Sequence, residues 1–385
     1  MRVVIAPDSF KGSNTSVRVA ETIERGILKV FPRAEVHRVP IADGGEGTVE
    51  AVVLGGGGEY RDVTVTGPLG APVAARYGIL SGGRGVIEMA AASGLPLVPT
   101  DRRDPLLTTT YGTGELIRDA LDHGCTELLI GIGGSATNDA GVGMAQALGF
   151  SFLDASGHEV RGCGGDLHRI ETIDTSSADR RLSGCKISVA CDVRNPLYGD
   201  EGAAAIYGPQ KGADEKTIES LDSGLRHFAG IAGRAFDVDL QAIPGAGAAG
   251  GLGAGLVVFC GAELKSGIDA ILDIVRFDEA VRGADLVLTG EGAMDGSSTY
   301  GKVPVGIARR MSGTDIPVVA IVGDIGKGAS AVYALGIDGI MSTVSRAVPL
   351  EVALRESSEM LEDAAERLMR FLSVGMRLGK KKDEV

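Results

Sequence analysis

The first 40 residues of the chain carry the pattern that most restricts its fold. A short apolar run at residues 3–6 is followed by a stretch in which Ala20, Ile23 and Ile27 recur three and four positions apart. A second strand-like run covers residues 35–40. The first run is typical of a strand buried on both faces, and the spacing after it predicts a helix with one apolar stripe. A strand, a helix and a strand in succession predict a parallel sheet with a right-handed connection.

The same alternation returns near the C-terminus, whereas the part after the second strand differs. Residues 61–90 contain short alternating runs around a Gly/Pro turn, a pattern typical of antiparallel hairpins. We therefore expect an α/β protein with two domains. Residues 1–60 and 281–385 would form a Rossmann/flavodoxin-like domain with a parallel sheet, built from both termini. Residues 61–280 would form an inserted mixed α/β domain, and residues 105–150 fit either domain.

Two further expectations follow from this organisation. A cleft between two domains is a common place for a ligand, so we expect the functional site there. The last seven residues, GKKKDEV, are mostly charged and are expected to be disordered.

Charge and composition exclude several classes of partner. The formal net charge of −13 argues against nucleic acid or an anionic membrane as the main partner, and the absence of Trp leaves few stacking platforms. No apolar run approaches the roughly 18 residues that span a bilayer, and no signal-peptide segment precedes the first strand. The five cysteines form no CxxC pair. We expect a cytoplasmic protein that binds small molecules, and the sequence leaves a homo-oligomer open.

Charged residues concentrate in glycine-rich loops that follow strand-like runs. Phosphoryl transfer requires lysines that spread the charge of the phosphates, carboxylates that hold Mg²⁺, and a base that orients the attacking hydroxyl. Each loop alone is more often an ordinary turn, but together they predict a site that handles phosphate. The loops are APDSFKGS (residues 6–13), ADGGEG (42–47), GIGGSATNDAG (131–141), ACDVRNP (190–196), GPQKG (208–212) and GEGAMDGSSTYGK (290–302).

Two of these loops also fit nucleotide-binding motifs of other protein classes. The stretch GSSTYGKV, residues 296–303, lacks only the final Ser or Thr of a P-loop. We reject a P-loop, because we expect the preceding strand to end near Thr289 and GEGAMD then intervenes. The stretch GIGGSA, residues 131–136, fits a dinucleotide fingerprint with Asp154 as the ribose-binding acid, although the polar residues 137–139 favour Mg²⁺ and phosphate. An NAD(P)-dependent dehydrogenase is therefore the alternative enzyme, and a metabolite sensor without turnover is the third hypothesis.

Taken together, the loop sequences resemble the type I glycerate kinase family of bacteria. The resemblance runs from residue 1 to about residue 345, with fitting order and spacing. It implies phosphorylation of D-glycerate that depends on ATP and Mg²⁺, with 2-phosphoglycerate or 3-phosphoglycerate as the product, and a two-domain fold unlike that of P-loop kinases. The matching stretches are APDSFKGS, ADGGEGT, VTGPLG, IEMAAASGL, TTTYGTGELI, IGIGGSATNDAG, ACDVRNPL, GPQKGA and PGAGAAGGLG.

One loop departs from the pattern GEGRxDxQT that the family often carries. Ala293 and Ser297 stand where that pattern has Arg and Gln, so an Arg–phosphate contact at this loop is missing or is supplied elsewhere. The residues of the loop that still match are Glu291, Asp295, Thr299, Gly301 and Lys302.

Our hypothesis is a glycerate kinase whose site gathers the charged loop residues. Asp192 is the first candidate for the group that positions or deprotonates the attacking hydroxyl, Asp8 is the second, and Lys11 is a further catalytic residue. The residues expected to bind substrate or phosphate are Ser9, Lys11, Gly133, Gly134, Ser135, Thr137, Asn138, Asn195, Lys211, Glu291 and Lys302. The expected Mg²⁺ ligands are Asp43, Glu46, Asp139 and Asp295.

Overall fold

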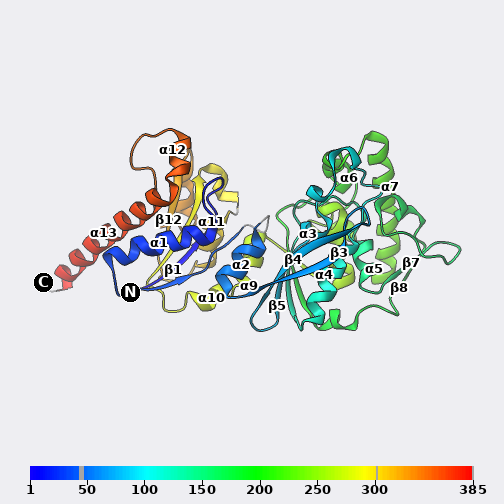
Figure 1. The fold of residues 1–385 in the computed structure, drawn as a ribbon, viewed down its shortest axis with the longest axis horizontal. Helices are drawn as coiled ribbons and strands as arrows, with labels where there is room; N and C mark the ends of the chain where they lie inside the picture. The colour runs from blue at the N-terminus through cyan, green and yellow to red at the C-terminus, as the bar shows by residue number, and fades with distance from the viewer. Residues whose placement is uncertain (43–46, 301, 384–385) are drawn as a thin grey trace. The chain divides into compact units, whose positions relative to one another are not determined.

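The computed structural model describes residues 1–42, 47–300 and 302–383 of the chain. The chain divides into two compact units (Figure 1). Unit 1 comprises Met1–Asp43, Glu50–Gly56 and Ile271–Val385, and unit 2 comprises Gly44–Val49 and Gly57–Ala270. Unit 1 thus takes its chain from both termini.

The elements of each unit follow in chain order. Those of unit 1, with α2 and α9 at its borders, are β1 (Arg2–Pro7), α1 (Ser16–Val30), β2 (Glu35–Arg38), α2 (Thr48–Gly56), α9 (Gly267–Ile274), α10 (Phe277–Ala280), β11 (Leu286–Met294), the 3-10 helix η8 (Gly296–Tyr300), α11 (Val303–Arg310), β12 (Val318–Ile325), η9 (Ala329–Leu335), β13 (Gly339–Ser342), α12 (Leu350–Arg355) and α13 (Ser357–Asp383). Those of unit 2 are β3 (Glu59–Thr66), β4 (Pro72–Leu80), β5 (Arg84–Glu88), α3 (Ala90–Ser93), α4 (Tyr111–Asp122), β6 (Glu127–Gly131), α5 (Val142–Ala147), β7 (Ser151–Leu153), β8 (Thr172–Asp174), β9 (Lys186–Ala190), α6 (Ala203–Tyr207), η5 (Pro209–Lys211), α7 (Glu215–Phe236), α8 (Leu252–Cys260) and β10 (Glu263–Lys265), together with short 3-10 turns.

Unit 1 is built on a sheet of five parallel strands in the order β13-β12-β11-β1-β2. Counted along the chain within this unit, the order is 2-1-3-4-5, which is the flavodoxin-like arrangement. The predicted α/β class with a flavodoxin-like parallel sheet is therefore confirmed. The chain moves from β1 to β2 in one direction and from β11 to β13 in the other, so the strand order reverses between β1 and β11.

Helices α1 and α13 pack together in a shared apolar core of unit 1. The predicted apolar stripe of α1 is confirmed, because Ala20, Ile23 and Ile27 are all buried in this core. The two helices approach each other very closely at Gly26. A Cβ atom on Gly26 would lie 2.6 Å from the Cβ atom of Ala365 in α13. Glycine is therefore required for this crossing of the helices.

Helix α13 is longer than the sequence predicts. Disorder was expected for residues 379–385, but the helix continues to Asp383, and residues 384–385 lie outside the described part. Two ion pairs four positions apart support the helix before this point. Arg367 lies 2.8 Å from Asp363, and Arg370 lies 2.7 Å from Glu366. Pairs with this spacing stabilise a helix, which a composition-based expectation of disorder does not consider.

Strand β11 is also longer than the sequence predicts. The strand was expected to end near Thr289, but it pairs with β12 as far as Met294. Its glycines were taken as a loop signal, yet the pairing depends on them. A Cβ atom on Gly290 would overlap the carbonyl oxygen of Ile321, and one on Gly323 of β12 would overlap the Gly292 carbonyl oxygen. The glycines thus allow two backbones to approach closely within the sheet.

Unit 2 is built on a mixed sheet in the order β10-β9-β6-β5-β4-β3. Strands β3, β4 and β5 pair antiparallel, as predicted for residues 61–90, whereas β5, β6, β9 and β10 are parallel. Residues 105–150, which the sequence leaves to either domain, lie within unit 2. The parallel register brings Glu88, Gly131 and Ala190 to one edge of the sheet. The loops that follow these three residues therefore begin side by side.

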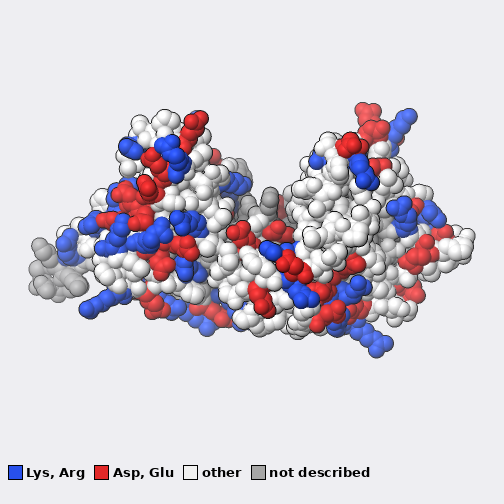
Figure 2. Space-filling model, in the orientation of Figure 1, with Lys and Arg blue, Asp and Glu red and all other residues white. Residues whose placement is uncertain are grey.

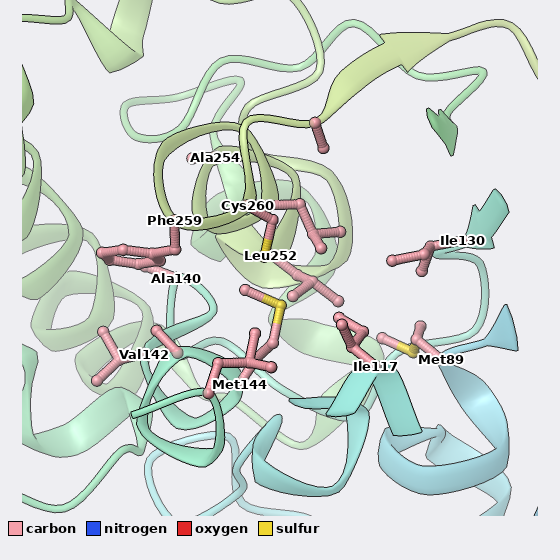
Figure 3. Close-up of a cluster of buried hydrophobic side chains, with 14 of the residues drawn as sticks. Met89, Ile117, Ile130, Ala140, Val142, Met144, Leu252, Ala254, Phe259 and Cys260 are labelled. Carbon is pink, nitrogen blue, oxygen red and sulfur yellow. The ribbon is translucent and has the colours of Figure 1, made fainter. Parts of the chain in front are cut away.

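The core of unit 2 packs helix side chains against one another and against the sheet (Figure 3). Met144 of α5 and Leu252 of α8 are both fully buried there. Phe259 adds an aromatic cluster, with ring centroids 5.1 Å from Phe150 and 5.5 Å from Phe152. Tilted and edge-on ring pairs of this kind add stability beyond the area that they bury.

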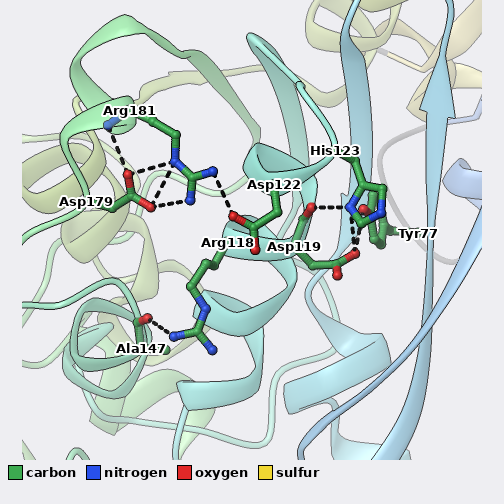
Figure 4. A network of polar contacts seen from close by, with 8 residues as sticks. All are labelled: Tyr77, Arg118, Asp119, Asp122, His123, Ala147, Asp179 and Arg181. Carbon is green, nitrogen blue, oxygen red and sulfur yellow. Dashed lines mark hydrogen bonds and ion pairs between the residues drawn. The ribbon is translucent and has the colours of Figure 1, made fainter.

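A polar network ties α4 to its neighbours in unit 2 (Figure 4). Arg181 joins Asp122 of α4 to Asp179, with a nitrogen–oxygen distance of 2.7 Å to each carboxylate. The Tyr77 hydroxyl of β4 donates to Asp119 Oδ2 at 2.8 Å, and burial together with this carboxylate raises the pKa of Tyr77. The network stabilises the packing of α4 in unit 2 and contains none of the predicted site residues.

Both signs of charge are mixed on the face of the molecule drawn in Figure 2. On the face shown in Figure 2, Lys and Arg side chains alternate with Asp and Glu, so that face has no broad basic field of the kind that nucleic acid requires. Among the described helices, none combines the length and apolar character needed to cross a bilayer.

Candidate active site

The loop after β1 begins where the strand order of unit 1 reverses. Open α/β sheets bind ligands beyond the carboxyl ends of their strands at this switch point. The Asp8 N–H donates to the Gly290 carbonyl oxygen of β11 at 2.8 Å, and Asp8 Oδ1 accepts from the Ser9 N–H at 2.6 Å. Lys11 is exposed, and a Cβ atom on Gly292 would lie 3.5 Å from its backbone nitrogen. Three predicted site residues thus lie at the edge where such sheets bind ligands.

Strand β11 brings a buried carboxylate next to a lysine at the same edge. Glu291 is only 4% exposed, and Lys302 Nζ lies 3.4 Å from its Oε2. Burial raises the pKa of Glu291, while Ser298 and Lys302 oppose this shift. The other oxygen, Oε1, is buried and has no hydrogen-bond partner among the described residues. A buried carboxylate oxygen without a hydrogen-bond partner costs free energy. We therefore expect a ligand or a cation to bind this oxygen.

The same loop carries Asp295 and the two departures from the family pattern. Asp295 Oδ1 accepts from the Ser297 N–H at 2.7 Å, and the hydrogen bonds from Ser297 lower the pKa of Asp295, so this carboxylate stays ionised. Ala293 is exposed in β11 and pairs with Asp324 of β12. Ser297 therefore orients a predicted Mg²⁺ ligand, whereas Ala293 contributes no charge.

A magnesium ion fits the carboxylates of this edge. Mg²⁺ is usually bound through one or two carboxylates together with phosphate oxygens and water. Oε1 of Glu291 and the ionised carboxylate of Asp295 are oxygens of that kind. Three or more His, Cys, Asp or Glu side chains do not cluster anywhere in the part of the chain that the structure describes. The other two predicted ligands, Asp43 and Glu46, lie outside the described residues.

In unit 2 the predicted phosphate-binding loop follows β6. Gly133 and Gly134 are exposed, and a Cβ atom on Gly133 would meet no atom within 4 Å. Gly134 has a φ of +73°, which favours glycine, and its carbonyl oxygen accepts from the Leu95 N–H at 2.8 Å. Ser135 is buried and forms an isolated antiparallel β-bridge with Gly94. The contacts with Gly94 and Leu95 thus hold the loop in place, and open space remains beside Gly133.

The next three predicted ligand residues are buried inside unit 2, contrary to expectation. Thr137, Asn138 and Asp139 are all fully buried. Asp139 accepts from the Thr110 N–H and hydroxyl at 2.7 and 2.8 Å, and from the Gly141 N–H at 3.2 Å. Burial raises the pKa of Asp139, and these hydrogen bonds oppose the shift. Asp139 therefore fixes its own loop, and we do not retain it as a Mg²⁺ ligand.

Lys211, which was expected from the sequence to bind phosphate, is also buried within unit 2. Its side chain is 1% exposed, and its Nζ donates to the Thr137 carbonyl oxygen at 2.6 Å. Burial lowers the pKa of Lys211 to about 7, while the charge of Asp139 opposes this shift. Within the described residues, the Thr137 hydroxyl and the Asn138 side-chain amide have no hydrogen-bond partner. Lys211 therefore holds the loop after β6 from inside the unit.

The loop after β9 carries the predicted base. Asp192 is exposed, and its Oδ1 accepts from the Gly267 N–H at 2.8 Å, which fixes the orientation of the carboxylate. Asn195 is bonded within the fold, because its Oδ1 accepts from the Tyr207 hydroxyl at 2.7 Å and its Nδ2 donates to the Glu201 carbonyl oxygen at 2.8 Å. The exposed carboxylate of Asp192 is accessible to a substrate, whereas the hydrogen bonds of Asn195 stabilise the loop after β9.

Sequence reasoning missed two residues that hold these loops in place. Thr110 supplies two of the hydrogen bonds to Asp139. Gly250 has a φ of +72°, and a Cβ atom there would overlap the carbonyl oxygen of Thr137. Both residues belong to stretches that resemble the family, TTTYGTGELI and PGAGAAGGLG. The resemblance marks these stretches, but it does not indicate what they contact.

One pocket of unit 2 lies apart from the predicted residues. It has a volume of about 320 Å³ and is lined by Thr109, Tyr111, Gln146 and Arg161 among others. None of its lining residues is a predicted site residue. The candidate site is therefore defined by the loops at the carboxyl ends of the strands rather than by this pocket.

The geometry argues against a dinucleotide site at GIGGSA. In that fingerprint the helix starts at the glycine loop, so that its N-terminus meets the pyrophosphate. Here β6 ends at Gly131 and the next helix begins only at Val142. Asp154, the proposed ribose-binding acid, instead accepts from the Ser156 and His158 N–H groups within a turn.

The fold and the loops together define an α/β enzyme with the residue set of a phosphotransferase. Carboxylates, lysines and glycine amides lie at the carboxyl ends of its parallel strands, and no covalent nucleophile is needed for that chemistry. The model of the glycerate kinase family matches residues 3–373, and the chain belongs to this family. The resemblance found in the sequence is thereby confirmed.

Known relatives are similar over nearly their whole length. A glycerate kinase of Bacillus subtilis (strain 168) is 50% identical, with 99% of each chain covered. A glycerate 2-kinase of Escherichia coli (strain K12) is 48% identical, covering 98% of this chain and 99% of the relative. A crystal structure of a related protein from Salmonella typhimurium LT2 superposes with a TM-score of 0.89 at 46% identity, covering 98% of this chain and 99% of that one.

Proposed function

We propose that the protein transfers the γ-phosphoryl group of ATP to the C2 hydroxyl of D-glycerate, with 2-phosphoglycerate and ADP as products. Family membership supports the substrate, and the similarity to the E. coli glycerate 2-kinase supports the C2 position. The observation that carries the proposal is the buried Glu291 beside Lys302 at the switch point of unit 1. A carboxylate and a lysine at this position suit a nucleotide phosphate with its cation.

The residues of unit 1 would bind and neutralise the phosphates. Lys11 and Lys302 would contact phosphate oxygens and spread the negative charge that moves during transfer. Glu291 and Asp295 would hold Mg²⁺, together with Asp43 and Glu46. Mg²⁺, when bound, would neutralise charge on the bridging and terminal phosphate oxygens. Asp8 and Ser9 would orient the loop that carries Lys11.

The residues of unit 2 would orient glycerate and accept its proton. The hydroxyl oxygen would form a bond to the γ-phosphorus, the bond from that phosphorus to the bridging oxygen would break, and ADP would leave. Asp192 would take the hydroxyl proton and pass it to water. The amides of Gly133, Gly134 and Ser135 would face anionic oxygens. Thr137, Asn138, Asn195 and Lys211 would support these loops from within the fold.

Phosphorus NMR of the reaction tests both the activity and its regiochemistry. The protein, Mg²⁺, ATP and D-glycerate should yield ADP and the resonance of 2-phosphoglycerate, with 3-phosphoglycerate as the reference for the other hydroxyl. A 3-phosphoglycerate signal would correct the position and keep the kinase. Tight binding of NADH without binding of ATP would instead favour the dehydrogenase, and ligand binding without turnover would favour a sensor.

Two lysine variants test the assignment of unit 1. Lys11→Ala and Lys302→Ala should each lower kcat by on the order of 10² to 10³, the usual loss for a preorganised charge-stabilising group. Both variants keep the core intact, because Lys11 is exposed and Lys302 is 43% exposed. Near-normal turnover in both variants would refute the assignment.

We also propose that the enzyme works in the cytoplasm. All five cysteines are free thiols, and four of them are buried. Unpaired thiols are typical of a reducing compartment.

A further inference from the structure

Four aliphatic side chains remain exposed at the carboxyl edge of the unit 1 sheet. Ile325, Val344, Leu350 and Leu354 are 47%, 37%, 73% and 38% exposed. Ile325 is the last residue of β12, Val344 follows the end of β13, and the two leucines lie on α12, the short helix before α13 in Figure 1. We call these four side chains the edge patch.

Helix α12 contributes an apolar face that packs against no core. The helix spans six residues, and none of them is buried. Leu350 and Leu354 are four positions apart and therefore lie on the same face. A surface helix normally buries such a face against its own domain. Apolar side chains that stay exposed at a ligand-binding edge suit a surface for a ligand or a partner.

Two hydrogen-bonded links attach this region to the loops of the candidate site. The Thr343 N–H donates to the Val322 carbonyl oxygen at 2.8 Å, so the segment that begins with Val344 lies against the end of β12. The Asn14 side chain donates to Ser357 Oγ at 2.9 Å, which ties the loop after β1 to the start of α13. The segment that contains α12 is thus anchored at both of its ends to the carboxyl edge of the sheet.

The edge patch lies next to the loops that carry lysines. A Cβ atom on Gly12 would lie 4.0 Å from Leu354 Cδ2, and Lys11 precedes that glycine. Ile325 is two residues before Lys327, which is exposed. The region therefore combines an apolar surface with positive charge, and a ligand that fits it needs an apolar part and an anionic part.

The two substrates of the proposed reaction differ in this respect. Glycerate has a carboxylate and two hydroxyls on three carbons, so it offers no apolar face for four aliphatic side chains. A purine nucleotide has a flat base with apolar faces and a chain of anionic phosphates. Only the nucleotide matches both the patch and the lysines beside it.

We propose that unit 1 binds the nucleotide, with its purine base against the edge patch and its phosphates toward Lys11, Lys302 and Lys327. This inference rests on the proposed kinase function. The loops after β1, β11 and β12 would hold the phosphates, and α12 would cover one face of the base. Binding would remove the exposed face of α12 from water, which accounts for a helix that otherwise buries none of its residues.

Calorimetric titration of the full-length protein with ADP and with inorganic tripolyphosphate tests the proposal. Ile325→Glu and Leu350→Glu should each weaken ADP binding about tenfold or more, because each puts a charge against an apolar base. Both should weaken the binding of tripolyphosphate, which has no base, clearly less than the binding of ADP, because the added charge repels both ligands but only ADP loses a base contact. Lys327→Ala should weaken both ligands. The matched control is Val374→Glu on α13, whose parent residue is 43% exposed in the same unit.

The outcomes separate this inference from the function on which it rests. If the parent protein phosphorylates glycerate but both patch variants keep its affinity for ADP, the edge patch is not the base site and the kinase stands. If Val193→Glu, in the loop after β9, weakens ADP binding and the patch variants do not, the base binds in unit 2. If the parent protein neither binds ADP nor turns over glycerate, the proposed function itself fails.

Discussion

Lys211 is closed off from water, and among the described residues its ammonium group makes one close polar contact. Its Nζ donates to the Thr137 carbonyl oxygen at 2.6 Å. Lys211→Met keeps the length of the side chain but leaves that oxygen without a donor, a loss of about 1 to 3 kcal/mol for a buried group. We expect kcat to fall about tenfold or more, because the loop after β6 loses its internal support.

The control for this variant is Lys216→Met, five positions further along the chain. Lys216 is exposed on α7, so its loss should leave kcat and both KM values unchanged. The assays belong at a temperature well below unfolding, so that a less stable protein is not mistaken for a less active one. A Lys211→Met enzyme with parental kcat would show that the lysine serves stability alone.

The pKa of Lys211 also predicts how stability responds to pH. Burial lowers this pKa to about 7, whereas the usual pKa of a lysine, 10.5, applies in the unfolded chain. Between these pH values the unfolded state binds more protons than the folded state, so the free energy of unfolding rises with pH in this window. Relative to Lys211→Met, the parent protein should gain up to about 1.4 kcal/mol per pH unit. Urea unfolding of both proteins at pH 7, 8 and 9 measures this difference, and a constant difference would contradict the expectation.

At the scale of single residues, the sequence located the loops but not the direction of each side chain. Asp192 and Lys11 are exposed in loops after strands, as expected of ligand-binding residues. Asp139 lies in a loop of the same kind and Lys211 ends the 3-10 helix η5, yet both side chains are buried within unit 2. Asp139 accepts two hydrogen bonds from Thr110, which lies 29 positions away in the chain. Local spacing carries no information about such a partner.

At the scale of elements, the close contact between α1 and α13 predicts how a substitution of Gly26 changes stability. Alanine is favoured over glycine by about 1 kcal/mol within a helix, yet Gly26→Ala should destabilise the protein. The new Cβ atom would lie 2.6 Å from both the Ala365 Cβ atom and the Glu362 carbonyl oxygen, and neither atom can rotate away. Forcing the helices apart should cost about 1 to 3 kcal/mol net, visible as a lower thermal midpoint.

Helix α7 offers the matched glycine for comparison. Gly230 is exposed, and its nearest neighbour to a new Cβ atom is the mobile end of the Arg234 side chain at 3.7 Å. Gly230→Ala should therefore raise the free energy of unfolding by about 0.5 to 1 kcal/mol. Equal effects of the two substitutions would show that helix propensity, and not the close crossing of α1 and α13, decides the outcome.

Elements with a strong internal period were predictable, whereas those that depend on a neighbour were not. The stripe of α1 and the hairpins of β3 to β5 follow from their own residues. Strand β11 was predicted too short, because Gly290 and Gly292 weaken a strand in isolation, and the need for glycine at position 290 arises only once β12 lies beside it. The sequence thus started the loop after β11 too early, although it assigned Glu291 and Lys302 to the same candidate loop, and the structure brings their side chains within 3.4 Å of each other.

At the scale of the whole molecule, the return of the α/β rhythm at the C-terminus predicted that both termini share one sheet. The pairing of β1 with β11 shows this directly. The domain bounds themselves remain a proposal. The core of unit 2 consists only of residues between Val65 and Ala262, whereas the core of unit 1 combines residues from Val3 to Ile27 with residues from Leu286 to Met369. We therefore propose that only unit 2 can fold from a single continuous segment.

A pair of fragments tests this proposal. Residues 57–270 contain every strand of the unit 2 sheet and its core, so this fragment should unfold cooperatively on heating, as followed by circular dichroism. Residues 271–385 lack β1, the strand beside β11, and α1, the helix packed on α13, so this fragment should show no cooperative transition. Mixing it with a peptide of residues 1–56 should restore one, because that peptide supplies both elements. A fragment 57–270 without a cooperative transition would show that unit 2 depends on the rest of the chain to fold.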